Sequence, residues 1–282
     1  MAAPLEGIKV LDLTQRISGP SCTKLLGDFG AKVTKIERPW GGDPARAQGP
    51  FYGDDPHPEK SAPFLHLNTN KRSVTLNLKS SIGREIVKQL AIEADIVVEN
   101  FRPGQMTAFD LGYDAIKDLN PAVVLTSISN FGQSGPFRDL KASEIVSFAM
   151  GGPMNVTGNI EREPLKLGSN VVAYHAGAVA AYATMLAVYT AEFTGIGEQI
   201  DVSIYETQAA FRDRRAAYLT AYSYSGDTGK RGTAGSRVAT GARPVADGYI
   251  NVNSAGGNRF ASICEMIGHP ELALDPRFAA PG

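Results

Sequence analysis

The residues best suited to bind an anion lie near the start of the chain. Ser18, Gly19 and Pro20 end a predicted strand and open a predicted helix, which leaves unpaired backbone N–H groups for a phosphate or a carbonyl oxygen. Arg38 directly follows the second predicted strand, at the carboxyl edge of the sheet where α/β proteins bind ligands. Helix starts and single arginines also occur in α/β proteins without such a site, so these residues alone leave a purely structural role open.

Other side chains that commonly carry chemistry are dispersed. The four histidines are scattered, which indicates neither a Ser-His-Asp arrangement nor a ligand cluster, and we expect no metal. The two cysteines lie far apart and suit no disulfide framework, so we expect a reducing, cytoplasmic compartment. Cys22 lies near the predicted helix start, where a thiolate would be stabilised, but we expect a buried structural thiol there.

The elements that must position these groups alternate between strands and helices. The predicted strands span 8–13, 32–37, 73–78, 95–99 and 123–129, and the predicted helices between them span 20–29, 81–94 and 113–119. Further along, helices are predicted at 144–150, 171–193, 207–224 and 259–267, with strands at 199–204 and from 248. The alternation predicts βαβ units and an α/β, Rossmann-like parallel sheet that is buried on both faces.

Length and composition indicate a soluble protein of about two domains. The chain has 282 residues, 43% of them apolar and 20% charged, and its net charge of −1 argues against a nucleic-acid partner. We expect a large Rossmann-like domain at 1–225, a linker at 226–247, and the beginning of a second, smaller α+β domain at 248–282. The start of the chain shows no signal-peptide pattern, and the apolar helix at 171–193 is rich in alanine, so we expect burial in protein and no membrane.

Several blocks together resemble one known family. They are LDLTQRISGPSCTKLLGDFGAKVTKIERPWGGDPAR near the start, LNTNKRSVTLNLKS, ENFRPG, SISNFGQSGP, TGIGEQIDVSIYE and PELALDPRF. Their order and extent resemble the class III CoA-transferases, the family of formyl-CoA transferase, carnitine CoA-transferase and the bile-acid-inducible protein. The resemblance implies coenzyme A or an acyl-CoA as substrate, a carboxylic acid as the second substrate, no tightly bound cofactor, and an interlocked dimer.

The resemblance also implies which residues bind CoA. Charge-assisted hydrogen bonds from arginine and lysine suit a ligand with several phosphate charges at one end. Residues that match the family's CoA contacts are Ile17, Ser18, Arg38, Asn68, Thr69, Asn70, Lys71, Asn100, Phe101, Arg102 and Lys141.

Two positions depart from the family pattern. The family's nucleophilic aspartate falls between glycines equivalent to Gly168 and Gly177, and this chain has Ala173 at that position. An alanine cannot attack a thioester, so the resemblance implies that the reactive group is missing. The family usually also has an arginine where this chain has Ala108. Glu144 matches an acidic residue near the family's site and is the weak candidate for a remaining catalytic carboxylate.

These departures leave three hypotheses. In the first, the chain is the inactive subunit of a CoA-transferase and works beside a homologous subunit that carries the aspartate, as in the two-subunit succinyl-CoA:benzylsuccinate transferases. The sequence leaves open whether the assembly is such a heteromer or a homodimer. In the second, it is a lyase, hydrolase or isomerase that acts on an acyl-CoA without a covalent intermediate. In the third, it is a non-enzymatic acyl-CoA binding protein. Family members are usually longer, so we expect either a shortened product or a segment supplied by another chain.

Overall fold

A computed structural model describes residues 3–159, 161–209, 222–226, 241–252 and 259–278. The chain divides into two compact units. The first comprises residues 1–152 and 167–211, and the second comprises residues 153–166 and 212–282. The domain limits stated above stay predictions.

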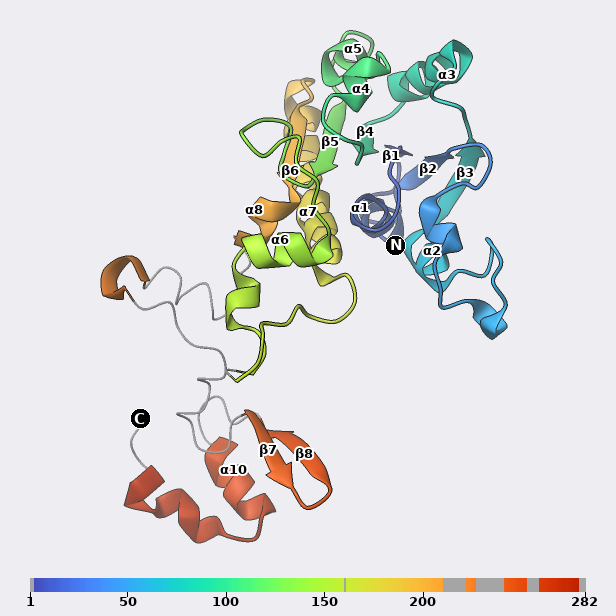
Figure 1. The fold of residues 1–282 in the computed structure, drawn as a ribbon. Helices are drawn as coiled ribbons and strands as arrows, with labels where there is room; N and C mark the ends of the chain where they lie inside the picture. Colours follow the sequence, from blue (N-terminus) through green and yellow to red (C-terminus); the bar gives the residue numbers. More distant parts are fainter. Residues whose placement is uncertain (1–2, 160, 210–221, 227–240, 253–258, 279–282) are drawn as a thin grey trace. The chain divides into compact units, whose positions relative to one another are not determined.

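Six parallel strands form the sheet of the first unit (Figure 1) and confirm the predicted α/β class. They are β1 (Lys9–Asp12), β2 (Lys32–Glu37), β3 (Lys71–Thr75), β4 (Ile96–Glu99), β5 (Val124–Ser129) and β6 (Gln199–Ser203). Their spatial order is β3-β2-β1-β4-β5-β6. Val10 of β1 is in register with Val33 on one side and with Ile96 on the other. The strand order therefore changes direction between β1 and β4, which is the switch point where Rossmann-like sheets bind ligands.

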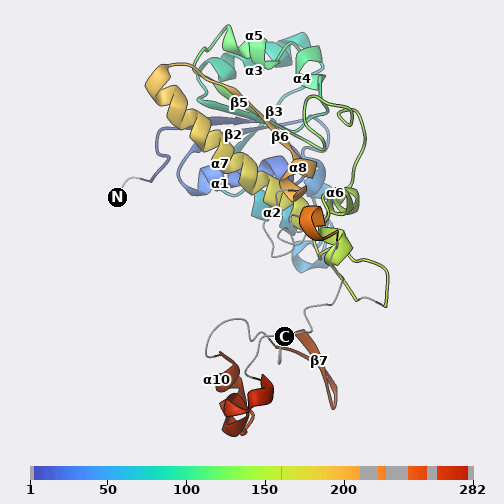
Figure 2. The same ribbon diagram turned by 90° about the vertical axis from the view of Figure 1, so that its left-hand side faces the viewer.

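Helices cover both faces of this sheet (Figure 2). The helices of the first unit are α1 (Ser18–Asp28), α2 (Ala62–Leu67), α3 (Ser81–Ile92), α4 (Gln105–Ala108), α5 (Tyr113–Lys117), α6 (Glu144–Met150), α7 (Val171–Thr194) and α8 (Ile204–Ala209). Helices α1 and α7 lie on one face, and α3, α4 and α5 lie on the other.

The alternation of side chains along the strands produces two separate cores. On β1, Val10 joins the core under α1 and α7, whereas its neighbour Leu11 joins the core under α3, α4 and α5. On β5, Val124 and Leu125 divide in the same way. Successive side chains of a strand point to opposite faces, so a sheet covered on both sides needs a continuous apolar run in its central strands.

The contact between α1 and α7 brings the start of one helix against the first turns of the other. A Cβ atom on Gly177 would overlap Oγ of Ser21 and lie 2.5 Å from the carbonyl oxygen of Ser18. Only a glycine allows the two backbones to approach this closely. Cys22 lies in the same contact with no exposed surface, and burial raises the pKa of its thiol to about 12, which confirms a buried structural cysteine.

We expect Gly177→Ala to lower the free energy of unfolding by about 1–3 kcal/mol, because the added methyl group must push a backbone carbonyl aside. Gly168→Ala is the matched control, since nothing lies within 4 Å of the position that its Cβ would take. Urea denaturation of both variants measures the difference. Equal stability of the two variants would show that α1 and α7 do not pack this closely.

Helix α7 is also apolar enough to raise the question of a membrane. Among the described residues it is the one helix that passes a length and hydropathy test for a span, and 44% of its most apolar window is buried inside the protein. A core helix of a soluble protein passes the same test, so this finding is weak evidence for a membrane span.

Some local elements differ from the predictions. The predicted loop at 39–63 contains two 3-10 turns, Pro44–Ala47 and Tyr52–Asp54. Short helices α2 and α4 were not predicted, and β3 begins two residues before its predicted start. Helix α8 begins before the predicted helix at 207–224, most of which lies outside the described residues. Short elements such as α2 depend on local caps, here Oγ of Ser61, which accepts a hydrogen bond from N of Phe64 at 3.3 Å.

In the second unit, β7 (Gly241–Val245) pairs with β8 (Gly248–Val252) in antiparallel fashion. Helix α10 (Arg259–Met266) and the 3-10 turns Pro270–Leu274 and Pro276–Phe278 follow, and the 3-10 turn Pro153–Val156 also belongs to this unit. Strand β7 lies in the segment where a linker was predicted, whereas most of the glycine-rich stretch at 226–241 lies outside the described residues.

Candidate functional site

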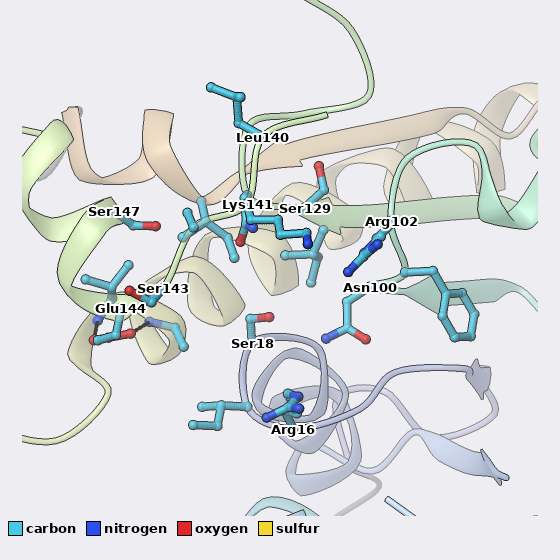
Figure 3. Close-up of a pocket in the computed structure, with 18 of the residues that line it drawn as sticks. Arg16, Ser18, Asn100, Arg102, Ser129, Leu140, Lys141, Ser143, Glu144 and Ser147 are labelled. Atoms are coloured by element: carbon cyan, nitrogen blue, oxygen red, sulfur yellow. Dashed lines mark hydrogen bonds between the residues drawn. The ribbon is translucent and has the colours of Figure 1, made fainter. Parts of the chain in front are cut away.

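A cavity of about 730 Å³ opens at the carboxyl edge of the sheet, within the first unit. Its walls come from the loop after β1, the turn after β4, the end of β5, the segment that leads into α6, and the first turn of α7 (Figure 3). Side chains from five places in the sequence meet here because the carboxyl ends of parallel strands share one edge. Residues that line the cavity include Arg16, Ile17, Ser18, Asn100, Phe101, Arg102, Arg138, Lys141, Glu144 and Ala173.

The loop between β1 and α1 forms one wall, and Asn100 holds it in place. The Oδ1 atom of Asn100 accepts a hydrogen bond from N of Gln15 at 2.8 Å, and its Nδ2 atom donates to O of Gln15 at 2.8 Å. Asn100 therefore links the first strand-end loop to the turn after β4. Ser18 is the first residue of α1 and is 7% exposed. Because Ser18 lies in this wall, the N-terminus of α1 is beside the cavity.

The turn after β4 is positioned by Glu99. Its Oε2 atom accepts a hydrogen bond from N of Phe101 at 2.7 Å, and its side chain is almost fully buried. Burial raises the pKa of Glu99 to about 7, although hydrogen bonds from Ser127 and the backbone of Phe101 oppose the increase. Arg102 extends from the same turn into the cavity (Figure 3).

We expect the free energy of unfolding to fall as pH rises from 5 to 8, and to fall less in Glu99→Gln. The pKa of Glu99 is about 7 in the folded protein and 4.5 in its ordinary state, so between these values the folded protein binds more protons than the unfolded chain. The difference between the two proteins should amount to roughly 2–4 kcal/mol over this range. Denaturant titrations at several pH values measure it, and identical pH profiles would contradict an elevated pKa at Glu99.

Glu144 caps the first turn of α7. Its Oε1 atom accepts a hydrogen bond from N of Val172 at 2.7 Å, and Oε2 accepts one from N of Ala173 at 3.3 Å (Figure 3). A carboxylate at this position satisfies free N–H groups and interacts favourably with the helix dipole. Both oxygens of Glu144 are therefore engaged in holding α7, and the half-buried methyl group of Ala173 faces the cavity beside them.

The structure brings some of the predicted CoA-binding residues together and leaves others apart. Ile17, Ser18, Asn100, Phe101, Arg102 and Lys141 all line the cavity, as do Glu144 and Ala173. Residues that do not line it are Arg38, Asn68, Thr69, Asn70, Lys71 and Ala108. The first group comes from loops at the switch point, whereas the second lies around β2, β3 and α4.

The outlying residues have local partners. Arg38 is exposed, and its Nε atom donates to O of Gly42 at 2.9 Å. The amide of Asn68 donates to O of Phe64 at 2.9 Å, and that of Asn70 donates to Oδ1 of Asp28 at 2.8 Å. These contacts fix the turn at 68–71 independently of any ligand. A role for these residues toward CoA stays a prediction.

Lys71 belongs to a buried group of charges that sequence reasoning did not identify. Its side chain is 2% exposed, and Nζ lies 3.1 Å from Oδ2 of Asp12 and 2.9 Å from O of Pro20. Lys35 lies 3.9 Å from the same carboxylate oxygen and 3.0 Å from Oδ2 of Asp43. Two lysines and two aspartates thus meet beneath the loop between β1 and α1, each with its charge compensated by a neighbour.

His175 and Tyr174 follow the alanine, but neither lines the cavity. Nδ1 of His175 lies 3.2 Å from Nε2 of Gln208, and burial lowers the pKa of the imidazole, which favours the neutral form. This environment favours a structural role for His175. Among the described residues, no group of three histidine, cysteine or acidic side chains is placed to hold a metal ion.

The site thus belongs to an α/β protein with a Rossmann-like sheet and a cationic ligand cavity at its switch point. The model for CoA-transferase family III matches residues 5–282, and this chain belongs to that family. It is 38% identical to the succinyl-CoA:glutarate CoA-transferase of Homo sapiens, over 98% of this chain and 62% of that protein. The chain therefore spans less than two thirds of the length of that relative.

Two further comparisons agree with the family assignment. The chain is 38% identical to the formyl-CoA:oxalate CoA-transferase of Streptomyces avermitilis, over 100% of this chain and 71% of that protein. The crystal structure of a CAIB/BAIF family protein from Brucella suis superposes with a TM-score of 0.85 at 34% identity, covering 100% of this chain and 74% of that one.

Proposed function

We propose that this chain is a class III CoA-transferase subunit that binds an acyl-CoA and lacks its own nucleophile. The observation that carries the proposal is Ala173, which lines the cavity at the first turn of α7, where the resemblance implies the family's aspartate. A transferase of this type needs a carboxylate that attacks the thioester, forms a mixed anhydride and then holds CoA as a thioester. The methyl group of Ala173 can do none of this.

The charges around the cavity support acyl-CoA as its ligand. Arg102, Arg138 and Lys141 line it from the turn after β4 and from the segment before α6. CoA carries several phosphate charges, and arginine provides planar, bidentate hydrogen bonds to such groups. A cavity of about 730 Å³ is also within the usual size of ligand pockets.

Transfer between an acyl-CoA and a carboxylic acid then requires a second chain. We infer a partner subunit of the same family that carries the aspartate, which makes this chain the structural half of a pair. A dimer of this chain with itself would hold two alanines at this position and would bind acyl-CoA without this transfer. Relatives named for glutarate and oxalate transfer CoA to or from dicarboxylic acids, and we propose the same substrate class here.

Binding of CoA tests the ligand assignment. We expect isothermal titration calorimetry to show one site per chain, and Arg102→Ala to weaken binding by about tenfold or more, since a charge-assisted hydrogen bond contributes about 1.5–3 kcal/mol when shielded from water. Arg72→Ala is the matched control, because Arg72 lies on β3 outside the cavity. Equal affinities of wild type and Arg102→Ala for CoA would contradict the assignment of this cavity as the CoA site.

Purification from the native cells tests the partner. We expect a tagged chain to co-purify with a homologue that has aspartate at the position of Ala173. Turnover of acyl-CoA by the isolated chain would instead support the lyase, hydrolase or isomerase hypothesis. Binding without partner or turnover would support a non-enzymatic acyl-CoA binding protein.

A further inference from the structure

Arg16 is held in the cavity wall in a backbone conformation that side chains rarely adopt. Its φ is +67°, in the left-handed region that costs a residue other than glycine roughly 1–2 kcal/mol. A strained backbone conformation persists only where the surrounding structure fixes it, and strained residues occur most often at functional sites. Arg16 has the only positive φ among the described non-glycine residues that line this cavity.

Three side chains hold the loop in this conformation. Oδ1 of Asp43 accepts a hydrogen bond from N of Arg16 at 2.9 Å. Nζ of Lys35 donates to O of Thr14 at 2.8 Å and lies 3.0 Å from Oδ2 of Asp43. Asn100 binds both backbone groups of Gln15, as described above. Lys35 and Asp43 are each about 1% exposed, so the Arg16 backbone is fixed by a buried ion pair while its side chain is exposed.

The packing of α1 on α7 shows which end of the cavity Arg16 serves. A Cβ atom on Gly177 would lie 2.5 Å from the carbonyl oxygen of Ser18, and Ala173 is four residues earlier on the same face of α7. The loop at 16–18 therefore lies beside the helix turn that carries Ala173, the position that the resemblance assigns to the family's nucleophile. In the view of Figure 3, Ser18 and Asn100 lie between Arg16, just before α1, and the pair Arg102 and Lys141.

No acidic side chain among the described residues forms an ion pair with Arg16. Glu144, whose side chain lies against the first turn of α7, uses both oxygens on the backbone N–H groups of Val172 and Ala173. The guanidinium of Arg16 thus brings a positive charge, without an acidic partner among the described residues, to the cavity that Ala173 also lines. Its planar fork matches a carboxylate in two-point geometry.

We propose that Arg16 binds the free carboxylate of a dicarboxylic acyl group, so that the chain selects acyl-CoAs whose acyl chain ends in a second carboxylate. This inference rests on the proposed function, because it assumes that CoA occupies the cavity. In this arrangement Arg102 and Lys141 bind the CoA moiety, and Arg16 binds the terminal carboxylate of the acyl group. Asp43 and Lys35 act as positioning residues that keep the Arg16 loop in place.

Calorimetry with three probes tests the inference: CoA, pentanoyl-CoA and glutaryl-CoA, the last two having acyl chains of equal length with and without a terminal carboxylate. We expect wild type to bind glutaryl-CoA more tightly than pentanoyl-CoA. Arg16→Gln should weaken glutaryl-CoA binding by about tenfold and change the other two by less than about twofold. Arg16→Lys, which keeps the charge without the fork, should fall between.

The outcomes separate this inference from the proposed function. If Arg16→Gln weakens all three ligands equally, Arg16 contacts the phosphates and the inference is wrong. If Arg16→Gln changes none of them, or if wild type does not prefer glutaryl-CoA, the inference is also wrong while CoA binding stands. If wild type binds none of the three, the proposed function fails and the inference with it. Arg72→Gln is the control for loss of one positive charge elsewhere, and thermal melts confirm that each variant is folded.

Discussion

Ala173→Asp should turn a chain that forms no covalent adduct with an acyl-CoA into one that does. Wild type presents a methyl group at this position, and the nearby Glu144 is bound to the first N–H groups of α7. Loss of a covalent nucleophile reduces rates by several orders of magnitude, so adduct formation by wild type should be undetectable. An aspartate at 173 would lie at a helix N-terminus, where its ionised, nucleophilic form is stabilised.

Intact-mass spectrometry after incubation with glutaryl-CoA, with hydroxylamine or borohydride trapping, measures the adduct. Ala173→Asn is the matched control, because it has the same shape but cannot attack a thioester. An adduct on wild type that maps to Glu144 would show that the nucleophile has moved, and would contradict the inactive-subunit proposal. If Ala173→Asp stays inert while CoA still binds, the site has lost more than one group, and Ala108→Arg is the next variant to combine with it.

Asp12→Ala should destabilise the fold by about 3–5 kcal/mol, the usual cost of removing one partner from a buried ion pair. Asp12 has no exposed surface, and Lys35 and Lys71 would be left with less compensating charge beneath the sheet edge. Thr14 and Thr23 would also lose the carboxylate oxygens to which they donate at 2.5 and 2.7 Å. Urea denaturation at pH 7 measures the change in the free energy of unfolding.

Asp110→Ala is the control, because Asp110 is exposed and pairs with Lys88 at the surface, so little change is expected. The buried carboxylate of Asp12 also makes the stability of the fold sensitive to acid. Burial alone would raise the pKa of Asp12, but Lys35 and Lys71, with Thr14 and Thr23, hold it well below its ordinary value of 3.8. A carboxyl whose folded pKa is depressed stabilises the fold above its ordinary pKa and loses this effect as pH falls. Wild type should therefore lose stability below about pH 4 more steeply than Asp12→Ala.

The α/β fold follows from patterns that are local in the sequence. The run at 32–37 forms β2 at its predicted limits, and 144–150 forms α6 at its predicted limits. The central strands carry the clearest pattern, because a strand buried on both faces is a nearly continuous apolar run, as Ile96, Val97 and Val98 are in β4. Short helices such as α2 and α4 carry no comparable apolar pattern in the sequence. Local caps and contacts with neighbouring elements stabilise them instead.

The main part of the candidate site was also accessible from the sequence. Ser18, Asn100 and Arg102 end or follow predicted strands, and parallel strands deliver their carboxyl ends to one edge. Which of these ends lie next to each other depends on the strand order, in which β4 pairs with β1 although more than 80 residues separate them. The sequence predicts a parallel sheet but no strand order, which only the tertiary structure shows.

Only the tertiary structure decided the roles of charged residues. Lys71 was expected to meet a phosphate, yet its ammonium group is buried against Asp12, a residue 59 positions earlier in the sequence. Nothing in the sequence around Arg16 distinguished it as a site residue. Its position depends on Asp43, which is 27 residues from Arg16, and on Asn100, which is 85 residues from the neighbouring Gln15. A sequence records that a residue is charged, whereas the energy of that charge depends on burial and on partners that only folding brings within a few ångströms.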